Sequence, residues 1–237
     1  MDKEPYMQAG LHQLWSVYHA TKRGKEDEVS IFMLEKKLWD SKKSMSENPN
    51  MREEALGVLK KDPFNLMKLR HPAILNLIEQ PAEDDKYVVF ITEYVPYSLA
   101  CLADSTKDHL RDKIPSPIEI KMIALELLEA INFLHQNAKQ VHAGIAPENI
   151  FITKAGKIKI GGLNFSTMIG TEGDCNVPIM PMTRFNEFLM YPNLRFAAPE
   201  ISNQMPKCSP SSDLYSIGAL IFFLLAVEQK REPYLLS

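Results

Sequence analysis

The β-forming and helix-forming stretches of this chain are separated along its length. Loose alternation of apolar and polar residues, with many β-branched and aromatic side chains, predicts strands over residues 15–18 and 29–34. Two more strands are predicted over residues 73–78 and 87–92, and residues 150–153 and 157–160 are predicted to form a short hairpin. Strands first and helices afterwards are typical of the α+β class, with a β-rich N-terminal lobe and a helical second lobe.

Helical apolar spacing occurs in three places. Residues 51–61 have it, and Asp62-Pro63 then predicts a break followed by a second short helix over residues 64–69. A capping box at residues 116–119 predicts a long amphipathic helix that ends near Gln136. Ser212 is predicted to cap a last helix that begins at Leu214 and is apolar nearly all round, so we expect it to be buried.

Composition limits the functions open to the chain. Its 237 residues carry a formal net charge of −3, so no overall basic field draws it to nucleic acid. Cys101, Cys175 and Cys208 have no paired spacing, which favours reduced thiols over a disulfide framework or a zinc site. The charged N-terminus lacks the apolar core of a signal peptide. The apolar run over residues 214–227, about 14 residues, is shorter than the roughly 20 that span a bilayer, so no transmembrane segment is expected.

Four short motifs stand in order over the second half of the chain. They are Phe-Leu-His at 133–135, Val-His through Pro-Glu-Asn-Ile at 141–150, Ala-Pro-Glu at 198–200 and Ser-Asp-Leu-Tyr-Ser-Ile-Gly at 212–218. Together they resemble the protein kinase superfamily, over residues 10–227. The resemblance implies a bilobal fold with an N-lobe over residues 1–93, a hinge at 94–97 and a C-lobe over 98–237.

The positions that carry kinase chemistry are replaced. By this resemblance, Gly144 stands where the catalytic-loop aspartate accepts the hydroxyl proton, and Ala146 replaces a lysine that contacts the phosphate. Gly162 replaces the magnesium-binding aspartate of Asp-Phe-Gly, and Phe32 replaces the strand lysine that pairs with the phosphates. Glycine has no side chain that could act as a base. We therefore predict a pseudokinase, which is not an enzyme.

Little remains that could bind nucleotide or metal. Asn149 is the only metal ligand left, and a neutral amide is a poor site for magnesium, so no metal is expected. The phosphate-covering loop keeps one glycine and gains Trp15, which we expect to pack with Phe32 between the lobes. ATP, if it binds at all, is expected to bind weakly and without magnesium, against the residues Val17, Ser30, Glu93, Val95 and Asn149. The partner of the missing lysine falls at Asp62.

Three kinase residues with scaffold roles are retained. Asp213 corresponds to the residue that holds the catalytic-loop backbone, and Pro199 and Glu200 to those that anchor the activation segment. The arginine that pairs with Glu200 in kinases is absent, and Arg231 is a possible replacement.

Three stretches of the sequence indicate one particular family within the protein kinase superfamily. Residues 141–156, residues 69–72 with 90–93, and residues 193–200 resemble the Scy-like (Scy-one-like) pseudokinases, most of all their clathrin-associated second member. This resemblance implies a binding scaffold in clathrin-linked vesicle traffic between the Golgi and endosomes. Its partners would be vesicle-coat proteins, and it would be cytoplasmic, peripheral on those vesicles.

Two alternatives stay open: a weak ATP-binding kinase with residual serine/threonine phosphotransfer, and an inert partial gene product. Scy-like proteins carry helical repeats after the kinase-like domain, and this sequence has none. We therefore expect a truncated form, with an incomplete first strand and a C-lobe that lacks its last helices. Apolar side chains at 220–225 would then leave an exposed patch.

Overall fold

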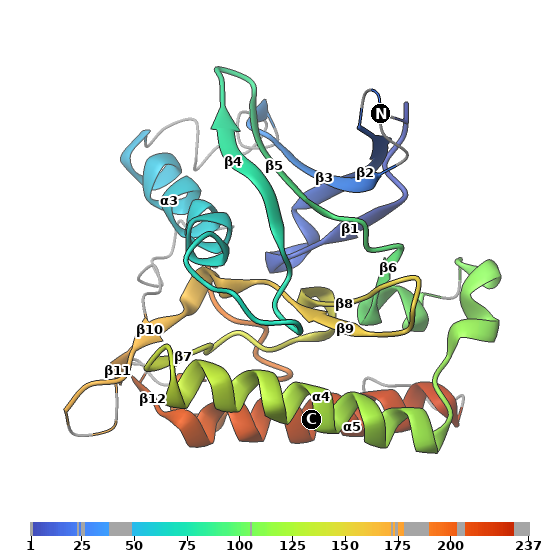
Figure 1. Ribbon diagram of the computed structural model, residues 1–237. Coiled ribbons are helices and arrows are strands. Elements are labelled where there is room, and N and C mark those ends of the chain that lie inside the picture. The colour runs from blue at the N-terminus through green and yellow to red at the C-terminus, as the bar shows by residue number, and fades with distance from the viewer. Residues whose placement is uncertain are drawn as a thin grey trace.

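The computed structural model shows two lobes, with a β-sheet and one helix above and two long helices below (Figure 1). It describes residues 2–22, 24, 27–37, 49–104, 106–171, 173, 175–177, 190–202 and 207–229, without the side chains of residues 49, 51 and 108. The predicted α+β kinase-like architecture is confirmed.

The N-lobe is built on a five-stranded antiparallel sheet in the order β1-β2-β3-β5-β4. Its strands are β1 (Met7–Ala9), β2 (Trp15–Thr21), β3 (Glu28–Glu35), β4 (Leu77–Glu83) and β5 (Tyr87–Glu93). Alternate residues of β5 are buried, which is the period expected of a strand with one covered face. The strands predicted over 15–18, 29–34 and 87–92 are thus confirmed and are slightly longer than predicted.

The strand predicted over residues 73–78 is wrong for most of its length, because β4 begins at Leu77. Residues 73–75 instead join the N-lobe to the second lobe. The Leu75 amide donates to the Ile160 carbonyl at 2.9 Å, and the Ile160 amide donates to the Ala73 carbonyl at 2.8 Å. These apolar residues are extended, as predicted, but they pair with a strand of the other lobe.

The predicted helix break at Asp62-Pro63 is also wrong: α3 runs from Pro49 to Leu66 with Pro63 inside it. Proline has no N–H to give to the carbonyl four residues earlier, which is Leu59. The Asn164 side-chain amide takes that place, since its Nδ2 lies 3.2 Å from the Leu59 oxygen and 3.1 Å from the Val58 oxygen. A distant side chain therefore lets the helix continue through the proline.

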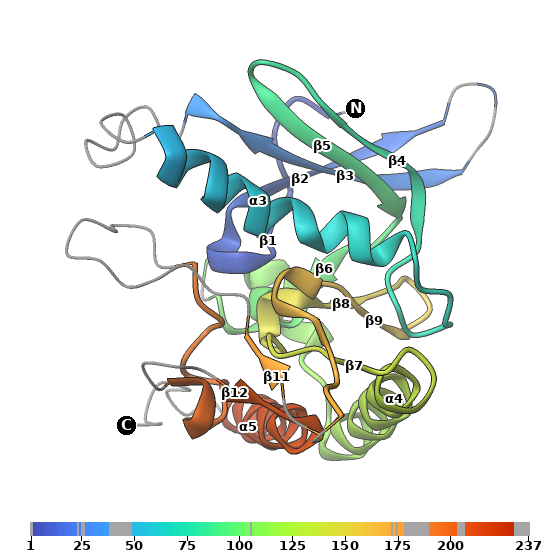
Figure 2. The same cartoon turned by 90° about the vertical axis from the view of Figure 1, so that its left-hand side faces the viewer.

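The second lobe rests on two helices that lie side by side at the base in both views (Figures 1 and 2). They are α4 (Pro117–Gln136) and α5 (Pro210–Glu228). Above them lie short strands: β6 (Tyr97–Ser98), β7 (Gln140–Val141), β8 (Ile150–Ile152), β9 (Ile158–Ile160), β10 (Thr167–Met168), β11 (Cys175–Asn176) and β12 (Lys207–Cys208). The predicted hairpin is β8 with β9, and α4 has both hydrogen bonds of the predicted capping box.

The last helix begins earlier than predicted. Ser209 is its N-cap and Pro210 its first residue, while Ser212 is the third helical residue, which completes the capping box. The hydrogen bond from the Ser209 amide to the Ser212 hydroxyl, at 3.0 Å, explains why the helix starts before the apolar run.

Within the described residues, α5 is the one helix that is long and apolar enough to cross a membrane by length and composition. Half of its most apolar window is buried inside the protein, and it carries the fully buried Asp213, as a core helix does. The face expected to be exposed at 220–225 is only partly so. Phe222 is 53% exposed, whereas Leu220, Phe223 and Leu224 are buried. Arg231 lies outside the described residues.

Candidate functional site

Aromatic side chains fill the cleft between the lobes. Phe32, at the position of the missing lysine, stacks on Phe90 with ring centroids 4.6 Å apart. The Trp15 ring contacts the Phe90 ring edge-on, with centroids 4.8 Å apart. The Phe151 ring, from the second lobe, contacts the Phe32 ring edge-on, with centroids 5.6 Å apart. All four rings are at most 2% exposed, so the expected packing of Trp15 and Phe32 is confirmed. A continuous apolar column thus replaces the cationic site for phosphates.

The hinge backbone has a partner from within the chain. The Ser30 hydroxyl lies 3.0 Å from the Val95 amide, which donates to it. The Tyr6 hydroxyl lies 2.8 Å from the Ser30 oxygen and donates to the Val95 carbonyl at 2.7 Å. Burial raises the pKa of the Tyr6 phenol well above its ordinary value, so Tyr6 stays a neutral donor. No motif surrounds Tyr6 in the sequence, so its contact with the hinge was not predicted.

Of the residues predicted to contact nucleotide, Val17, Ser30 and Val95 come together here. Val17 is fully buried, and its carbonyl accepts from the Tyr6 amide at 2.9 Å. The Glu93 side chain takes part in other contacts: it accepts from the Asn76 amide at 2.9 Å and pairs with Lys159 at 2.8 Å. These residues, which were predicted to face an adenine, make contacts within the protein instead.

The loop that covers the phosphates in kinases closes onto the second lobe. Gly10 has a φ of +69°, and its amide donates to the Glu148 carbonyl at 3.0 Å. A Cβ at position 10 would lie 2.5 Å from Trp15 Cδ1, so only glycine fits against the indole. The one glycine kept from the loop therefore allows close packing, and its N–H is already used.

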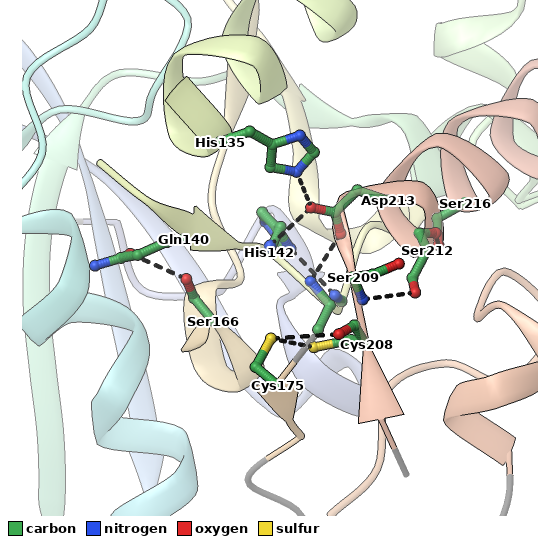
Figure 3. A network of polar contacts seen from close by, with 12 residues as sticks. His135, Gln140, His142, Ser166, Cys175, Cys208, Ser209, Ser212, Asp213 and Ser216 are labelled. Atoms are coloured by element: carbon green, nitrogen blue, oxygen red, sulfur yellow. Dashed lines mark hydrogen bonds and ion pairs between the residues drawn. The ribbon is translucent and has the colours of Figure 1, made fainter. Parts of the chain in front are cut away.

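Asp213 holds the catalytic-loop backbone, as predicted from the kinase resemblance. Its carboxylate accepts from the amides of His142 at 2.8 Å and Ala143 at 2.9 Å, and it contacts His135 Nε2 at 2.8 Å (Figure 3). Ala143 is held at a φ of +56°, which alanine rarely adopts. The frame of a catalytic loop is present, with Gly144 and Ala146 at the positions that carry aspartate and lysine in kinases.

His142 is a structural residue of this loop. Its Nε2 lies 3.0 Å from the Gly161 carbonyl, and its Nδ1 accepts from the Gly144 amide at 3.2 Å. Complete burial lowers the pKa of the imidazole, which favours the neutral form with one donor and one acceptor nitrogen. Ala146 is 1% exposed, and its carbonyl accepts from the Asn149 amide at 2.9 Å.

Asn149 occupies the space where a side chain at position 162 would lie. Its Nδ2 donates to the Gly144 carbonyl at 2.8 Å, and its buried Oδ1 has no hydrogen-bond partner in the described part of the chain. A Cβ on Gly162 would come within 2.1 Å of Asn149 Cγ, and Gly162 has a φ of +74°. A metal-binding aspartate at 162 therefore does not fit this backbone. No group of three histidine, cysteine or acidic side chains among the described residues could hold a metal ion.

The segment that replaces Asp-Phe-Gly is fastened to α3. Asp62 Oδ1 accepts from the Leu163 amide at 2.8 Å, and Asn65 Nδ2 donates to the Leu163 carbonyl at 3.0 Å. Together with the hydrogen bonds from Asn164 to α3 described above, these contacts join α3 to the segment at residues 163–164. Asp62 is 4% exposed, and burial raises the pKa of its carboxyl to about 6 despite the backbone donors. Its position was predicted; its partner was not.

Two glutamates that hold the activation segment, Glu148 and Glu200, form hydrogen bonds with neutral side chains. The Ser212 hydroxyl donates to Glu200 Oε1 at 2.5 Å, and Pro199 begins the 3-10 turn Pro199–Ser202 beside it. Glu148 Oε1 accepts from Asn193 Nδ2 at 2.9 Å, and burial raises the pKa of Glu148. Within the described residues, Glu200 thus contacts the Ser212 hydroxyl at the start of α5, while Arg231, its possible partner, lies outside them.

A separate cavity lies beside the hinge, outside the packed space between the lobes. A groove of about 1110 Å³ is lined by the hinge residues Tyr94 and Tyr97, by α4 and by the turn between β8 and β9. It includes none of the predicted catalytic or nucleotide positions. The interlobe cleft is thus a packed interior, held by a kinase-like frame.

This fold and this frame define the class: the chain belongs to the protein kinase domain family, which matches residues 13–233. Its relatives narrow the class to the Scy-like proteins. SCY1-like protein 2 of Homo sapiens is 30% identical over 234 residues, 92% of this chain and 24% of that protein. The protein kinase-like protein SCY1 of Saccharomyces cerevisiae is 32% identical over 229 residues, 89% of this chain and 28% of that protein.

A named kinase is also similar over part of the chain. The serine/threonine-protein kinase SSN3 of Pyricularia oryzae is 26% identical over 160 residues, 68% of this chain and 30% of that protein. The chain spans less than a third of the length of each of these relatives.

Proposed function

We propose that this domain is a pseudokinase that transfers no phosphate and serves as a binding scaffold in clathrin-linked traffic between the Golgi and endosomes. The observation that carries the first part is Phe32. A phosphate-binding cation is replaced by a ring stacked on Phe90, and the site is closed to water by Trp15 and Phe151. Phosphoryl transfer depends almost entirely on positioned charges and metal ions.

The second support comes from the groups that would face a nucleotide. The Val95 amide is bonded to Ser30, and the Gly10 amide to the Glu148 carbonyl. A nucleotide would have to break these hydrogen bonds and displace the aromatic column, and each buried group left unpaired costs about 1–3 kcal/mol. We expect ATP to bind weakly or not at all, and magnesium to add nothing.

The test of catalysis is radiolabel transfer from ATP to a generic substrate and to the protein itself. An Asn149→Ala variant, purified in parallel, is the control, because it removes the last candidate metal ligand and leaves any contaminating kinase unchanged. We expect the same background signal from both. Transfer that is higher in the wild type than in Asn149→Ala would overturn the proposal and favour a residual kinase.

Calorimetry with ATP, with and without magnesium, tests the cleft separately. We expect no heat of binding at micromolar ATP and no shift in Tm in either condition. Tight binding that requires magnesium would contradict the proposal.

The role in traffic rests on the Scy-like relationship and on the retained frame around Asp213, which keeps a kinase shape without kinase chemistry. Its test is direct binding of the purified chain to purified clathrin and clathrin adaptors, measured on an immobilised surface. A catalytically active kinase domain of similar size is the control. Saturable binding to a coat protein, absent from the control, is expected; no saturable binding would remove this part of the proposal.

A further inference from the structure

Two cysteines that are far apart in the sequence face each other in the second lobe. Cys175 of β11 and Cys208 of β12 are directly paired across an antiparallel ladder. Their sulfur atoms lie 3.1 Å apart, and Figure 3 shows the two side chains pointing toward each other. They are 33 positions apart in the sequence, so no motif spacing could have indicated the pair.

The backbone at this pair suits a covalent bond between the sulfurs. Directly opposed residues of an antiparallel ladder have Cα atoms about 4.5–5.5 Å apart, within the roughly 4.4–6.8 Å found for disulfides. A disulfide bond is about 2.05 Å long, so the sulfurs need to approach by about 1 Å. We expect both residues to keep their ladder positions, because rotation of the side chains can bring the sulfurs together.

The structure assigns to Cys175 and Cys208 a reversible disulfide that fastens the activation segment to the start of α5. Nothing in the proposed function requires this bond. The two-residue strands β11 and β12 are too short to be stable by themselves, so a crosslink between them fixes a pairing that is otherwise easily lost. Cys208 directly precedes Ser209, the N-cap of α5, and Asp213 lies in the first turn of that helix.

The reaction has a natural order, because the two thiols differ in access. Cys175 is partly exposed, whereas Cys208 is 1% exposed, and burial raises the pKa of the Cys208 thiol. With oxidised glutathione as the oxidant, the Cys175 thiolate attacks one glutathione sulfur and releases one glutathione thiolate. The Cys208 thiolate then attacks the Cys175 sulfur of the mixed disulfide and releases the second. Two protein thiols lose two electrons and two protons, and one glutathione disulfide becomes two glutathione molecules.

The third cysteine provides an internal control. Cys101 is buried in the 3-10 turn Leu99–Ala103, where its sulfur contacts the Ser98 hydroxyl at 3.4 Å and the Lys107 ammonium at 3.3 Å. It pairs with neither of the other two cysteines in these contacts. We therefore expect Cys101 to remain a thiol under conditions that oxidise the pair.

The experiment is a titration of the purified chain with mixtures of reduced and oxidised glutathione, followed by thiol counting and peptide mass mapping. We expect the three thiols of the chain to fall to one, with a crosslinked peptide containing Cys175 and Cys208, reversed by dithiothreitol. A Cys101→Ser variant should form the same crosslink, and Cys175→Ser and Cys208→Ser should not. The oxidised chain should melt roughly 10 °C higher, because closing a loop of this length restricts the unfolded chain.

Three results would overturn the proposal: three thiols that persist in fully oxidised glutathione, a crosslink that involves Cys101, or a glutathione adduct on Cys175 that Cys208 never resolves. Since the wild-type chain is itself mapped, misfolding of a serine variant leaves the test intact.

Discussion

Asn164 donates a hydrogen bond to the carbonyl of Leu59, the helix carbonyl that Pro63 leaves without its usual intrahelical donor. The two residues are 105 positions apart. The segment at the position of the kinase Asp-Phe-Gly motif thus forms a structural contact with a helix of the N-lobe here.

Replacing Asn164 by aspartate tests that contact. The variant keeps the shape of the side chain but turns a donor into an acceptor that faces two carbonyls, so we expect a loss of about 2–4 kcal/mol in the free energy of unfolding. Urea denaturation measures it. Asn132→Asp, on the exposed face of α4, is the matched control and should change stability by less than about 0.5 kcal/mol. Equal effects at the two positions would show that the Asn164 contact is unimportant.

Asp62 makes stability depend on pH in an unusual direction. Its folded-state pKa of about 6 lies above the ordinary value near 3.9 for an unfolded chain, so the folded state binds the proton more tightly. The contribution of Asp62 to stability is therefore present below about pH 4 and is lost as pH rises through about 6. We expect Asp62→Asn to be more stable than the wild type at pH 7, by up to about 3 kcal/mol, and to lose this advantage near pH 4.

Denaturant titrations at pH 4, 5, 6 and 7 give the difference directly. Glu129→Gln, at an exposed position on α4, controls for the general effect of removing a carboxylate. An Asp62→Asn advantage that does not vary with pH would contradict the expected linkage.

Two glycines with the same backbone angle separate strain from steric clash at the metal position. Gly156 and Gly162 both have a φ of +74°, but a Cβ at 156 meets nothing within 4 Å, whereas one at 162 lies 2.1 Å from Asn149 Cγ. Gly156→Ala should cost about 1 kcal/mol, from backbone strain alone. Gly162→Ala should cost roughly 2–3 kcal/mol more, because Asn149 must move.

A double-mutant cycle completes this measurement. The smaller side chain of Asn149→Ser should recover part of the cost of Gly162→Ala. If the two alanine variants lose the same free energy of unfolding, Asn149 does not obstruct position 162.

The outer face of α5 predicts how the isolated chain behaves in solution. Leu214 and Phe222 are more than half exposed, and Ile221 and Leu225 are partly exposed on the same side of the helix. We expect the chain to bind a hydrophobic dye and to associate at high concentration. Phe222→Lys should lower both the dye fluorescence and the association while leaving Tm within a few degrees. A wild-type chain that stays monomeric without dye binding would contradict this reading of the face.

The sequence predicts the fold well because its signals are local. The period of β5, the capping box before α4 and the spacing of the four motifs each depend on neighbouring residues, and all agree with the structure. The scaffold role of Asp213 also follows from its motif, because its neighbours in the motif place it at the start of a buried helix.

Predictions fail or are missing where the deciding contact comes from a residue far away in the sequence. Asp62-Pro63 looks like a break because the side chain that compensates for proline is Asn164, in the other lobe. The pairing of Cys175 with Cys208 and the insertion of Tyr6 under the hinge depend on tertiary placement. The replaced catalytic positions and the packing of Trp15 and Phe32 between the lobes could be predicted from the sequence, whereas the hydrogen-bond partners of Asn149 and Asp62 could not.

The triad of Tyr6, Ser30 and Val95 has a consequence for pharmacology. Compounds that compete with ATP in kinases generally depend on a hydrogen bond to the hinge backbone, and here that donor already holds the Ser30 hydroxyl at 3.0 Å. Such a compound would have to displace Ser30 and the Tyr6 hydroxyl. The buried side chains of Phe32 and Trp15 would also occupy the space that it fills in a kinase. We therefore expect ATP-competitive kinase inhibitors not to bind this domain. Small molecules designed against it will have to bind its outer surfaces.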